Sequence, residues 1–271
     1  MTLKKPLTLS IVIPVYNEQH HLKRCLDAIA VQSVMPDTVI VVDNNSTDKS
    51  ASVAKKYPFV KVINEPTQGI VHARNTGFNA VKSDLIGRID ADTILPPDWV
   101  ERVHYFYSKN ENCKKALTGG GYFYNLRLPK LNGWLLSQLA YRLNWLLSRH
   151  YILWGSNMVL PMTVWLSTRS KTCTRQDIHE DVDLAIHTFQ EGFDIVYDNK
   201  LLVGVKLKRV WSERASKRAH MNRWPRTFKV HGYKLWWFGT IGNIFLNVIC
   251  EPFFFVAEMV ARLFRHRRIV Y

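Results

Sequence analysis

The chain of 271 residues is long enough for one large domain, and its hydrophobic content of 47% excludes a chain that is disordered throughout. Its formal net charge of +15 predicts anionic partners, namely nucleic acid, phosphate groups or an acidic membrane surface. Cys25, Cys113, Cys173 and Cys250 are far apart and form no CxxC pair, so they suggest neither a disulfide framework nor a zinc site and favour a reducing, cytoplasmic compartment.

The first hundred residues alternate between strand and helix patterns. The run LSIVIPV at 9–15 is apolar and largely β-branched, which is typical of a strand buried on both faces of a parallel sheet. After it, Leu22, Cys25, Leu26 and Ile29 recur at helical spacing. The predicted strands are 9–15, 38–46, 59–65 and 84–92, and the predicted helices are 17–33, 46–57 and 69–83. This alternation predicts an α/β fold, a doubly wound and mostly parallel sheet with helices on both faces.

Capping and turn residues mark the ends of several elements. Ser46 or Thr47 is expected to cap the helix at 46–57, and Gly192 is expected to end a helix at 179–192. The later part of the chain also predicts a strand with a glycine-rich turn at 114–125, a helix rich in Leu and Trp at 133–151, and a strand at 193–198. The N-terminal apolar run is too short for a secretory signal, so we expect none.

The C-terminal part combines basic and apolar segments. An uncharged run extends from Leu235 to Cys250, a little short of the roughly 18 apolar residues that a spanning helix needs. We expect a domain at 1–230 followed by a hydrophobic and basic helical segment at 231–271. Its tryptophans and closing RHRR suit an anionic membrane surface on the cytoplasmic face, although packing against the domain explains the pattern equally well.

Two phosphate-binding motifs are missing from the sequence. No GxGxxG follows the first strand and no GxxxxGK[ST] is present, which disfavours a dinucleotide-binding fold and excludes a P-loop. Polar residues follow the predicted strands instead, with Asp43 and Asp90 at two strand ends and Pro14 just before YNE. Ligands of such sheets bind beyond the carboxyl ends of the strands, so these residues are expected to share one edge.

Each of these residues suits a step in handling a nucleotide. Asp43 could accept hydrogen bonds from a base, and Asp90 and Asp92 could share a hard divalent cation, Mg²⁺ or Mn²⁺, with Asp92 the nearer ligand. Arg74 could contact phosphates, and Asp181 could deprotonate an acceptor hydroxyl from a helix start. Each residue also has a simpler explanation when it is considered alone. Asp43 could be a helix cap, Asp90 and Asp92 a solvated pair on a loop, Arg74 a surface arginine, and Asp181 an ordinary acidic residue at a helix start.

The segments PVYNE, VVDNNSTD, ARNTG, DAD and HED, in this order, resemble family 2 glycosyltransferases of the GT-A fold. The resemblance covers residues 9–197 and implies an inverting, nucleotide-sugar-dependent enzyme. It implies that the donor is bound by Pro14, Tyr16, Glu18, Asp43, Arg74, Asp90, Arg223 and Trp224. Asp90 and Asp92 match the DxD motif of the family, which holds the divalent metal.

The remaining motifs match the catalytic end of the family pattern. Glu180 and Asp181 match its ED motif, with Asp181 as the base. HMNRW is similar to the QxxRW motif, but His220 stands where the family has glutamine, which argues against a processive polysaccharide synthase. The implied partners are a UDP- or GDP-sugar donor and a glycan or lipid-linked acceptor, as in cell-surface glycan or glycolipid synthesis.

Two other functions remain open at this point. A sugar-phosphate nucleotidyltransferase would share the fold, but it favours a glycine-rich basic loop where this chain has YNEQHH. A basic nucleic-acid-binding protein would explain the charge, but no recognised nucleic-acid-binding motif is present, and we expect no nucleic-acid partner.

Overall fold

The computed structural model describes residues 7–124, 141–142, 144–146, 148–206 and 214–237, with the side chains of α8 described from residue 222 onward. Most of the helix predicted at 133–151 and of the C-terminal segment predicted at 231–271 therefore lies outside the described residues. No helix of the described part is long and apolar enough to cross a membrane.

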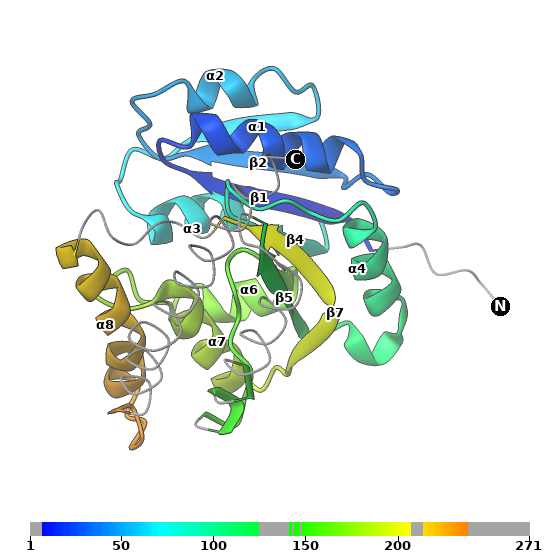
Figure 1. The fold of residues 1–271 in the computed structure, drawn as a ribbon. Coiled ribbons are helices and arrows are strands. Elements are labelled where there is room, and N and C mark those ends of the chain that lie inside the picture. Colours follow the sequence, from blue (N-terminus) through cyan, green and yellow to red (C-terminus); the bar gives the residue numbers. More distant parts are fainter. Residues whose placement is uncertain (1–6, 125–140, 143, 147, 207–213, 238–271) are drawn as a thin grey trace, which may run out of the picture.

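A seven-stranded sheet in the order β3-β2-β1-β4-β6-β5-β7 forms the centre of the molecule (Figure 1). The strands are β1 (Leu9–Val15), β2 (Thr38–Asp43), β3 (Val60–Asn64), β4 (Leu85–Arg88), β5 (Ala116–Phe123), β6 (Met158–Pro161) and β7 (Ile195–Val205). β6 runs antiparallel to its neighbours β4 and β5, and the other pairs are parallel. The predicted mostly parallel sheet is confirmed.

Helices cover both faces of this sheet, as predicted. They are α1 (Gln19–Ala30), α2 (Ser50–Ala54), α3 (Ile70–Ala80), α4 (Trp99–Ser108), α6 (Met162–Thr168), α7 (Glu180–Gln190) and α8 (Arg214–Val230), with a 3₁₀ turn η1 (Asn110–Asn112). Alternate residues of the buried strands point to opposite faces. Ile11 and Ile13 of β1 therefore pack under α1 and α4, while Val12 packs with α3, α6 and α7. This two-sided burial explains why the strand pattern in the sequence is almost continuously apolar.

Pro14 lies inside a central strand, where proline usually removes a ladder hydrogen bond. The carbonyl of Val12 accepts the N–H of Ile89 on the β4 side, and alternation places Pro14 on that same side. β4 ends at Arg88, which pairs with Val12. No residue of β4 pairs with Pro14, so the sheet loses no backbone hydrogen bond there. The sheet opens at this point, and the loop after β4 is free to carry polar residues.

Two local predictions are wrong. α2 begins at Ser50 rather than after Ser46 or Thr47, because Asp48 Oδ1 accepts the Ser50 N–H at 2.9 Å and starts the helix there. The glycines of 114–125 form no turn but lie within β5, against β7. A Cβ at Gly119 would lie 2.0 Å from the Leu201 carbonyl oxygen, so close strand packing explains that glycine.

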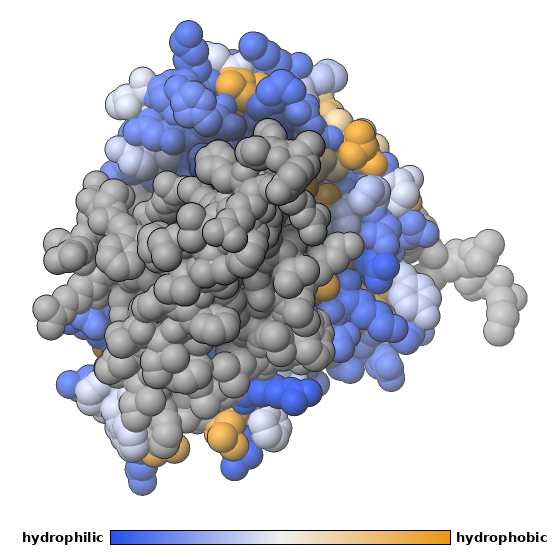
Figure 2. Space-filling view, viewed as in Figure 1, coloured by the Kyte–Doolittle hydropathy of each residue, from blue (hydrophilic) through white to orange (hydrophobic). Residues whose placement is uncertain are grey.

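The described part of the surface visible in Figure 2 is largely hydrophilic, with apolar residues scattered over it. Single exposed apolar side chains are ordinary in folded proteins.

Candidate active site

The loops after β1, β2 and β3 are tied to one another by asparagine side chains. Asn17 Oδ1 accepts the N–H of Thr47 at 2.8 Å, which joins the first two loops. The buried Asn44 donates to the carbonyls of Glu65 and Thr67 at 2.8 and 2.7 Å and accepts the N–H of Gly69 at 2.7 Å. These hydrogen bonds hold the three loops together at the carboxyl edge of the parallel strands, which we call the rim.

The predicted acidic pair follows directly after β4. Asp90 Oδ1 accepts a hydrogen bond from Arg88 Nη2 at 3.1 Å, and Oδ2 accepts one from Ser156 Oγ at 2.5 Å. Its side chain is 37% exposed, and Asp92 is half-buried nearby in the chain. The buried Arg88 therefore balances the charge of Asp90, whose side chain remains partly exposed.

Arg88 connects this pair to the other predicted motif. Its buried guanidinium contacts Asp90 as well as two carboxylates at the start of α7, pairing with Asp181 through Nη1 and lying 3.4 Å from Glu180 Oε1 through Nη2. Burial alone would lower the pKa of Arg88. The surrounding carboxylates, Asp181 foremost, raise it by more than burial lowers it, so the guanidinium stays charged. A buried cation requires such partners because an unpaired charge inside a protein is costly.

Asp181 is held on both of its oxygens. Oδ1 pairs with Arg88, and Oδ2 accepts the N–H of Gly155 at 2.8 Å. A Cβ at Gly155 would lie 2.0 Å from Arg88 Nη1, so only glycine leaves room for the guanidinium. The position in the first turn of α7 also places the carboxylate near the positive end of the helix dipole.

Glu180 and Asp181 are neighbours with opposite pKa shifts. Burial raises the pKa of Asp181 to about 6, and Arg88 limits the rise. Burial acts in the same direction on Glu180, but His179, Arg88 and Arg74 outweigh it and lower the pKa of this carboxyl to about 2. A pair whose pKa values are driven apart is the usual arrangement of an acid–base site, and here Asp181 is the group poised to take a proton near neutral pH.

Arg74 lies behind this site rather than on its surface. The side chain is fully buried, and Nη1 donates to the Glu180 carbonyl oxygen at 3.0 Å. Nε and Nη2 both donate to Asn75 Oδ1. The structure therefore shows Arg74 supporting the first turn of α7, a different position from the phosphate contact that its sequence motif predicts.

The other predicted residues are spread along the same rim and on α8. Tyr16 is 51% exposed, Glu18 and Asp43 are partly buried at the ends of β1 and β2, and Pro14 is buried within β1. Trp224 packs with Val182, Ile186 and Phe228 against the face of α7. Arg223 precedes it on α8 and is partly exposed.

The sequence reasoning missed the residues that join the motifs. Arg88 had a signal, because a lone arginine inside an apolar strand two positions before Asp90 implies a buried partner. Gly155, Ser156 and Asn44 had none, since each acts through contacts with segments distant in the sequence.

The acidic pair fits a hard divalent cation. Mg²⁺ and Mn²⁺ prefer carboxylate oxygens, and Mg²⁺ is commonly held by one or two carboxylates together with substrate phosphates. Arg88 and Ser156 each hold one oxygen of Asp90, and each oxygen retains a second lone-pair site that a cation can use. Both acids also act on Cys25 beneath them, where burial, Asp92 and Asp90 raise the pKa of the thiol and keep it neutral.

Comparison with known proteins gives a consistent result. Residues 10–159 match the model of glycosyl transferase family 2. The chain is 29% identical over 119 residues to the glycosyltransferase GlyA of Streptococcus pneumoniae, a match that covers 42% of this chain and 17% of GlyA. It is 35% identical over 97 residues to the chondroitin synthase of Pasteurella multocida, covering 34% of this chain and 10% of that enzyme. The matched region thus spans less than a fifth of either relative.

Solved structures show the same fold. The mannosyltransferase PcManGT from Pyrobaculum calidifontis, in complex with GDP-Man and Mn²⁺, superposes with a TM-score of 0.65 at 18% identity, covering 84% of this chain and 65% of that one. S. aureus TarS 1-349 in complex with UDP-GlcNAc superposes with a TM-score of 0.62 at 16% identity, covering 84% and 68%.

Proposed function

The chain belongs to glycosyl transferase family 2, and on that premise we propose that it is a metal-dependent, inverting glycosyltransferase. It moves a sugar from a nucleoside diphosphate sugar to a hydroxyl group of an acceptor. Asp90 and Asp92 hold the metal, and Asp181 is the base. The match to the family model covers residues 10–159, which include the acidic pair.

One observation carries the proposal. The buried guanidinium of Arg88 contacts both Asp90, from the acidic pair, and Asp181, from the start of α7. The guanidinium of Arg88 thereby holds together two motifs that are about ninety residues apart in the sequence. A transfer reaction needs the leaving diphosphate and the base on opposite sides of the reacting carbon, and this arrangement supplies an anchor for each.

The divalent metal, when bound, neutralises negative charge that builds on the leaving diphosphate. Asp181 takes the proton of the acceptor hydroxyl while that oxygen forms its bond to the anomeric carbon and the bond to the diphosphate breaks. The nucleoside diphosphate leaves with the electron pair, and the configuration of the sugar inverts. Each Asp181 oxygen accepts one hydrogen bond in the structure and retains a second lone-pair site for that proton.

Residues at the rim account for donor recognition. Tyr16 is exposed at the end of β1, where its ring can stack on a base, and Asp43 at the end of β2 can accept a base N–H. PcManGT and TarS bind GDP-Man and UDP-GlcNAc, respectively, which supports a GDP- or UDP-sugar here. Arg74 is a positioning residue for Glu180 rather than a donor contact, because it is buried beneath α7.

We place the reaction in cell-surface glycan or glycolipid synthesis on the cytoplasmic face of a membrane. The net charge of +15 and the basic stretch at 212–229 suit an anionic lipid surface. The Pasteurella relative is a chondroitin synthase, which supports a glycan as the acceptor.

Product analysis tests the chemistry directly. The full chain is incubated with Mn²⁺, a panel of UDP- and GDP-sugars and extracted glycan or lipid acceptors, and the released phosphates are separated. The proposal predicts nucleoside diphosphate in amounts equal to the sugar transferred, with the opposite anomeric configuration in the product. Release of pyrophosphate from sugar phosphate and nucleoside triphosphate would show nucleotidyl transfer instead.

A further inference from the structure

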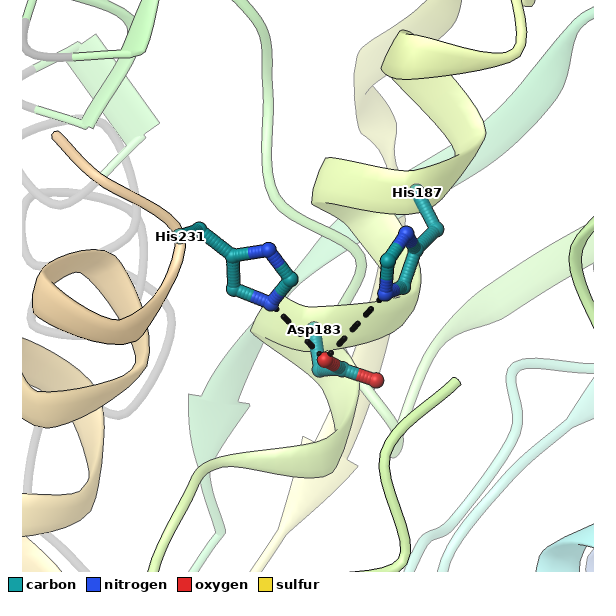
Figure 3. Close-up of side chains that lie close together, drawn as sticks. All are labelled: Asp183, His187 and His231. Carbon is teal, nitrogen blue, oxygen red and sulfur yellow. Dashed lines mark hydrogen bonds and ion pairs between the residues drawn. The ribbon is translucent and has the colours of Figure 1, made fainter. Parts of the chain in front are cut away.

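A second group of metal-ligating side chains lies between α7 and the end of α8. Figure 3 shows Asp183 and His187 on α7, with His231 approaching them from the residue after α8. One ligand atom from each residue can be chosen such that all three lie within 4.8 Å of one another. None of these residues belongs to the acidic pair at the sheet edge or to the set proposed to bind the donor.

We propose that Asp183, His187 and His231 form a Zn²⁺ site that joins α7 to the end of α8. It is separate from the divalent-metal site proposed at Asp90 and Asp92. The ion would link the two helices with water as its fourth ligand, and the proposal stands independently of the proposed transfer reaction.

The spacing of the ligands matches a metal centre. His231 Nε2 lies 2.9 Å from Asp183 Oδ1, and His187 Nε2 lies 3.6 Å from the same oxygen. Ligand atoms on a tetrahedral zinc ion, with bonds of about 2.0–2.1 Å, are separated by about 3.3 Å. Asp183 and His187 are four residues apart on one helix, so both point to the same side of α7. Small side-chain movements are sufficient to admit the ion.

The chemistry of the set favours Zn²⁺ over Mg²⁺ or Mn²⁺. Two imidazoles with one carboxylate are borderline-soft ligands that select zinc and similar transition metals, whereas hard cations prefer oxygen. A metal ion requires the neutral form of each imidazole, which is the ordinary form of histidine at neutral pH. When the ion binds, the proton that His231 Nε2 now donates to Asp183 has to move to Nδ1, so that Nε2 can coordinate.

Outer contacts hold the ligands in place. Asp183 is fully buried, and its second oxygen, Oδ2, accepts the N–H of Cys173 at 2.8 Å. Such outer hydrogen bonds orient the ligands of metal sites. The side chains of His187 and His231 are 14% and 11% exposed, so an ion can enter from the surface.

The position of the site gives it a consequence. Asp183 lies two residues after the base Asp181 in the first turn of α7. α8 already contacts the same end of α7, because Thr227 Oγ1 accepts the N–H of His179 at 2.8 Å. A bound ion would replace the hydrogen bond between His231 and Asp183 with a metal link and fix the turn that carries Glu180 and Asp181.

Cobalt is a suitable probe because Co²⁺ occupies zinc sites and its visible absorption reports coordination number and ligand type. The full chain, carrying a tag without histidine and freed of metal by a chelator, is titrated with Co²⁺ in excess Mg²⁺, and Zn²⁺ is then added. We expect one Co²⁺ with nitrogen-ligand absorption that Zn²⁺ displaces. The signal is expected to persist in Asp92→Ala, which removes the proposed donor-metal ligand.

Two variants and a matched control separate the site from other histidines. His187→Gln and His231→Gln keep an amide for hydrogen bonding but lose the ligand, and each is expected to weaken Zn²⁺ binding by at least about tenfold. His104→Gln, on α4 at the other side of the molecule (Figure 1), is expected to bind as the original does. Zn²⁺ should also raise the melting temperature of the original chain more than that of the two variants.

The proposal is overturned if the original chain shows no nitrogen-coordinated Co²⁺, or if both glutamine variants bind Zn²⁺ unchanged. Circular dichroism establishes whether the variants are folded. If they are not, the Asp92→Ala chain decides the question, because loss of the cobalt absorption there would assign the ion to the acidic pair.

Discussion

Arg88 Nη1 and Asp181 Oδ1 form a buried ion pair between residues 93 positions apart in the sequence. The same guanidinium holds Asp90 at 3.1 Å. One side chain therefore contacts both the proposed base and the first carboxylate of the acidic pair.

Asp181→Asn removes the proton acceptor but keeps a side chain of the same shape. We expect turnover to fall by about 10²–10⁴-fold while the affinity for nucleotide sugar changes little. Initial rates and calorimetric donor titrations measure the two effects. Asp177→Asn is the matched control, since Asp177 is a partly exposed acid three residues before α7 that pairs with Arg175 and Arg226. A variant at 181 with undiminished turnover would remove Asp181 from the role of base.

Arg88→Met leaves three carboxylates without their shared cation. Breaking a buried ion pair from one side costs about 3–5 kcal/mol in free energy of unfolding, so we expect a large loss of stability in urea titrations. The comparison is Arg102→Met, which breaks the exposed pair with Asp98 and should cost less than about 1 kcal/mol. Equal losses in the two variants would contradict the central position of Arg88.

Gly155→Ala tests the close packing at the base. Its Cβ would lie 2.0 Å from Arg88 Nη1, so the guanidinium has to move away from Asp181. We expect a lower melting temperature and a loss of turnover of at least tenfold, about 1.4 kcal/mol in the barrier. Ser156→Ala, one residue further, removes only the bond to Asp90 and should reduce donor affinity more than stability. Melting and turnover unchanged in Gly155→Ala would show that the contact is dispensable.

The pH dependence of turnover follows from the raised pKa of Asp181. With a pKa of about 6, the carboxylate is ionised at neutral pH and becomes protonated below that value. A protonated Asp181 cannot accept the acceptor proton, so turnover should fall as the pH drops through about 6 and level off above it. Glu180, with a pKa of about 2, stays ionised over this range and adds no second step. A flat rate between pH 5 and pH 8, a range chosen to bracket Asp181, would argue against the assignment.

The sequence predicted the fold well because buried parallel strands have a strong local pattern. The strand predicted at 9–15 is β1, and the strand predicted at 38–46 is β2, which ends at Asp43; both have apolar residues packed on both faces. The start of α2 was misjudged because Ser46, Thr47 and Asp48 are all good caps, and only contacts with the loop after β1 select among them.

The candidate site was predictable only in the residues that belong to short sequence motifs. Asp90, Asp92, Glu180 and Asp181 belong to short motifs that can be recognised locally. Their connection through Arg88, and the glycine that makes room for it, depends on contacts between distant segments. Arg74 illustrates the same limit, since a motif does not reveal whether an arginine faces a ligand or supports a helix from within.

Calorimetry of donor binding is the most direct test of whether Asp90 and Asp92 hold a metal that binds the donor. The original chain and the double variant Asp90→Ala, Asp92→Ala are titrated with the donor identified by product analysis, each with and without Mn²⁺. The metal site proposed at Asp90 and Asp92 predicts that the original chain binds nucleotide sugar in a Mn²⁺-dependent manner. The double variant is expected to bind it far more weakly and without dependence on Mn²⁺. Uptake of equal strength in both chains, at every metal concentration, would contradict it.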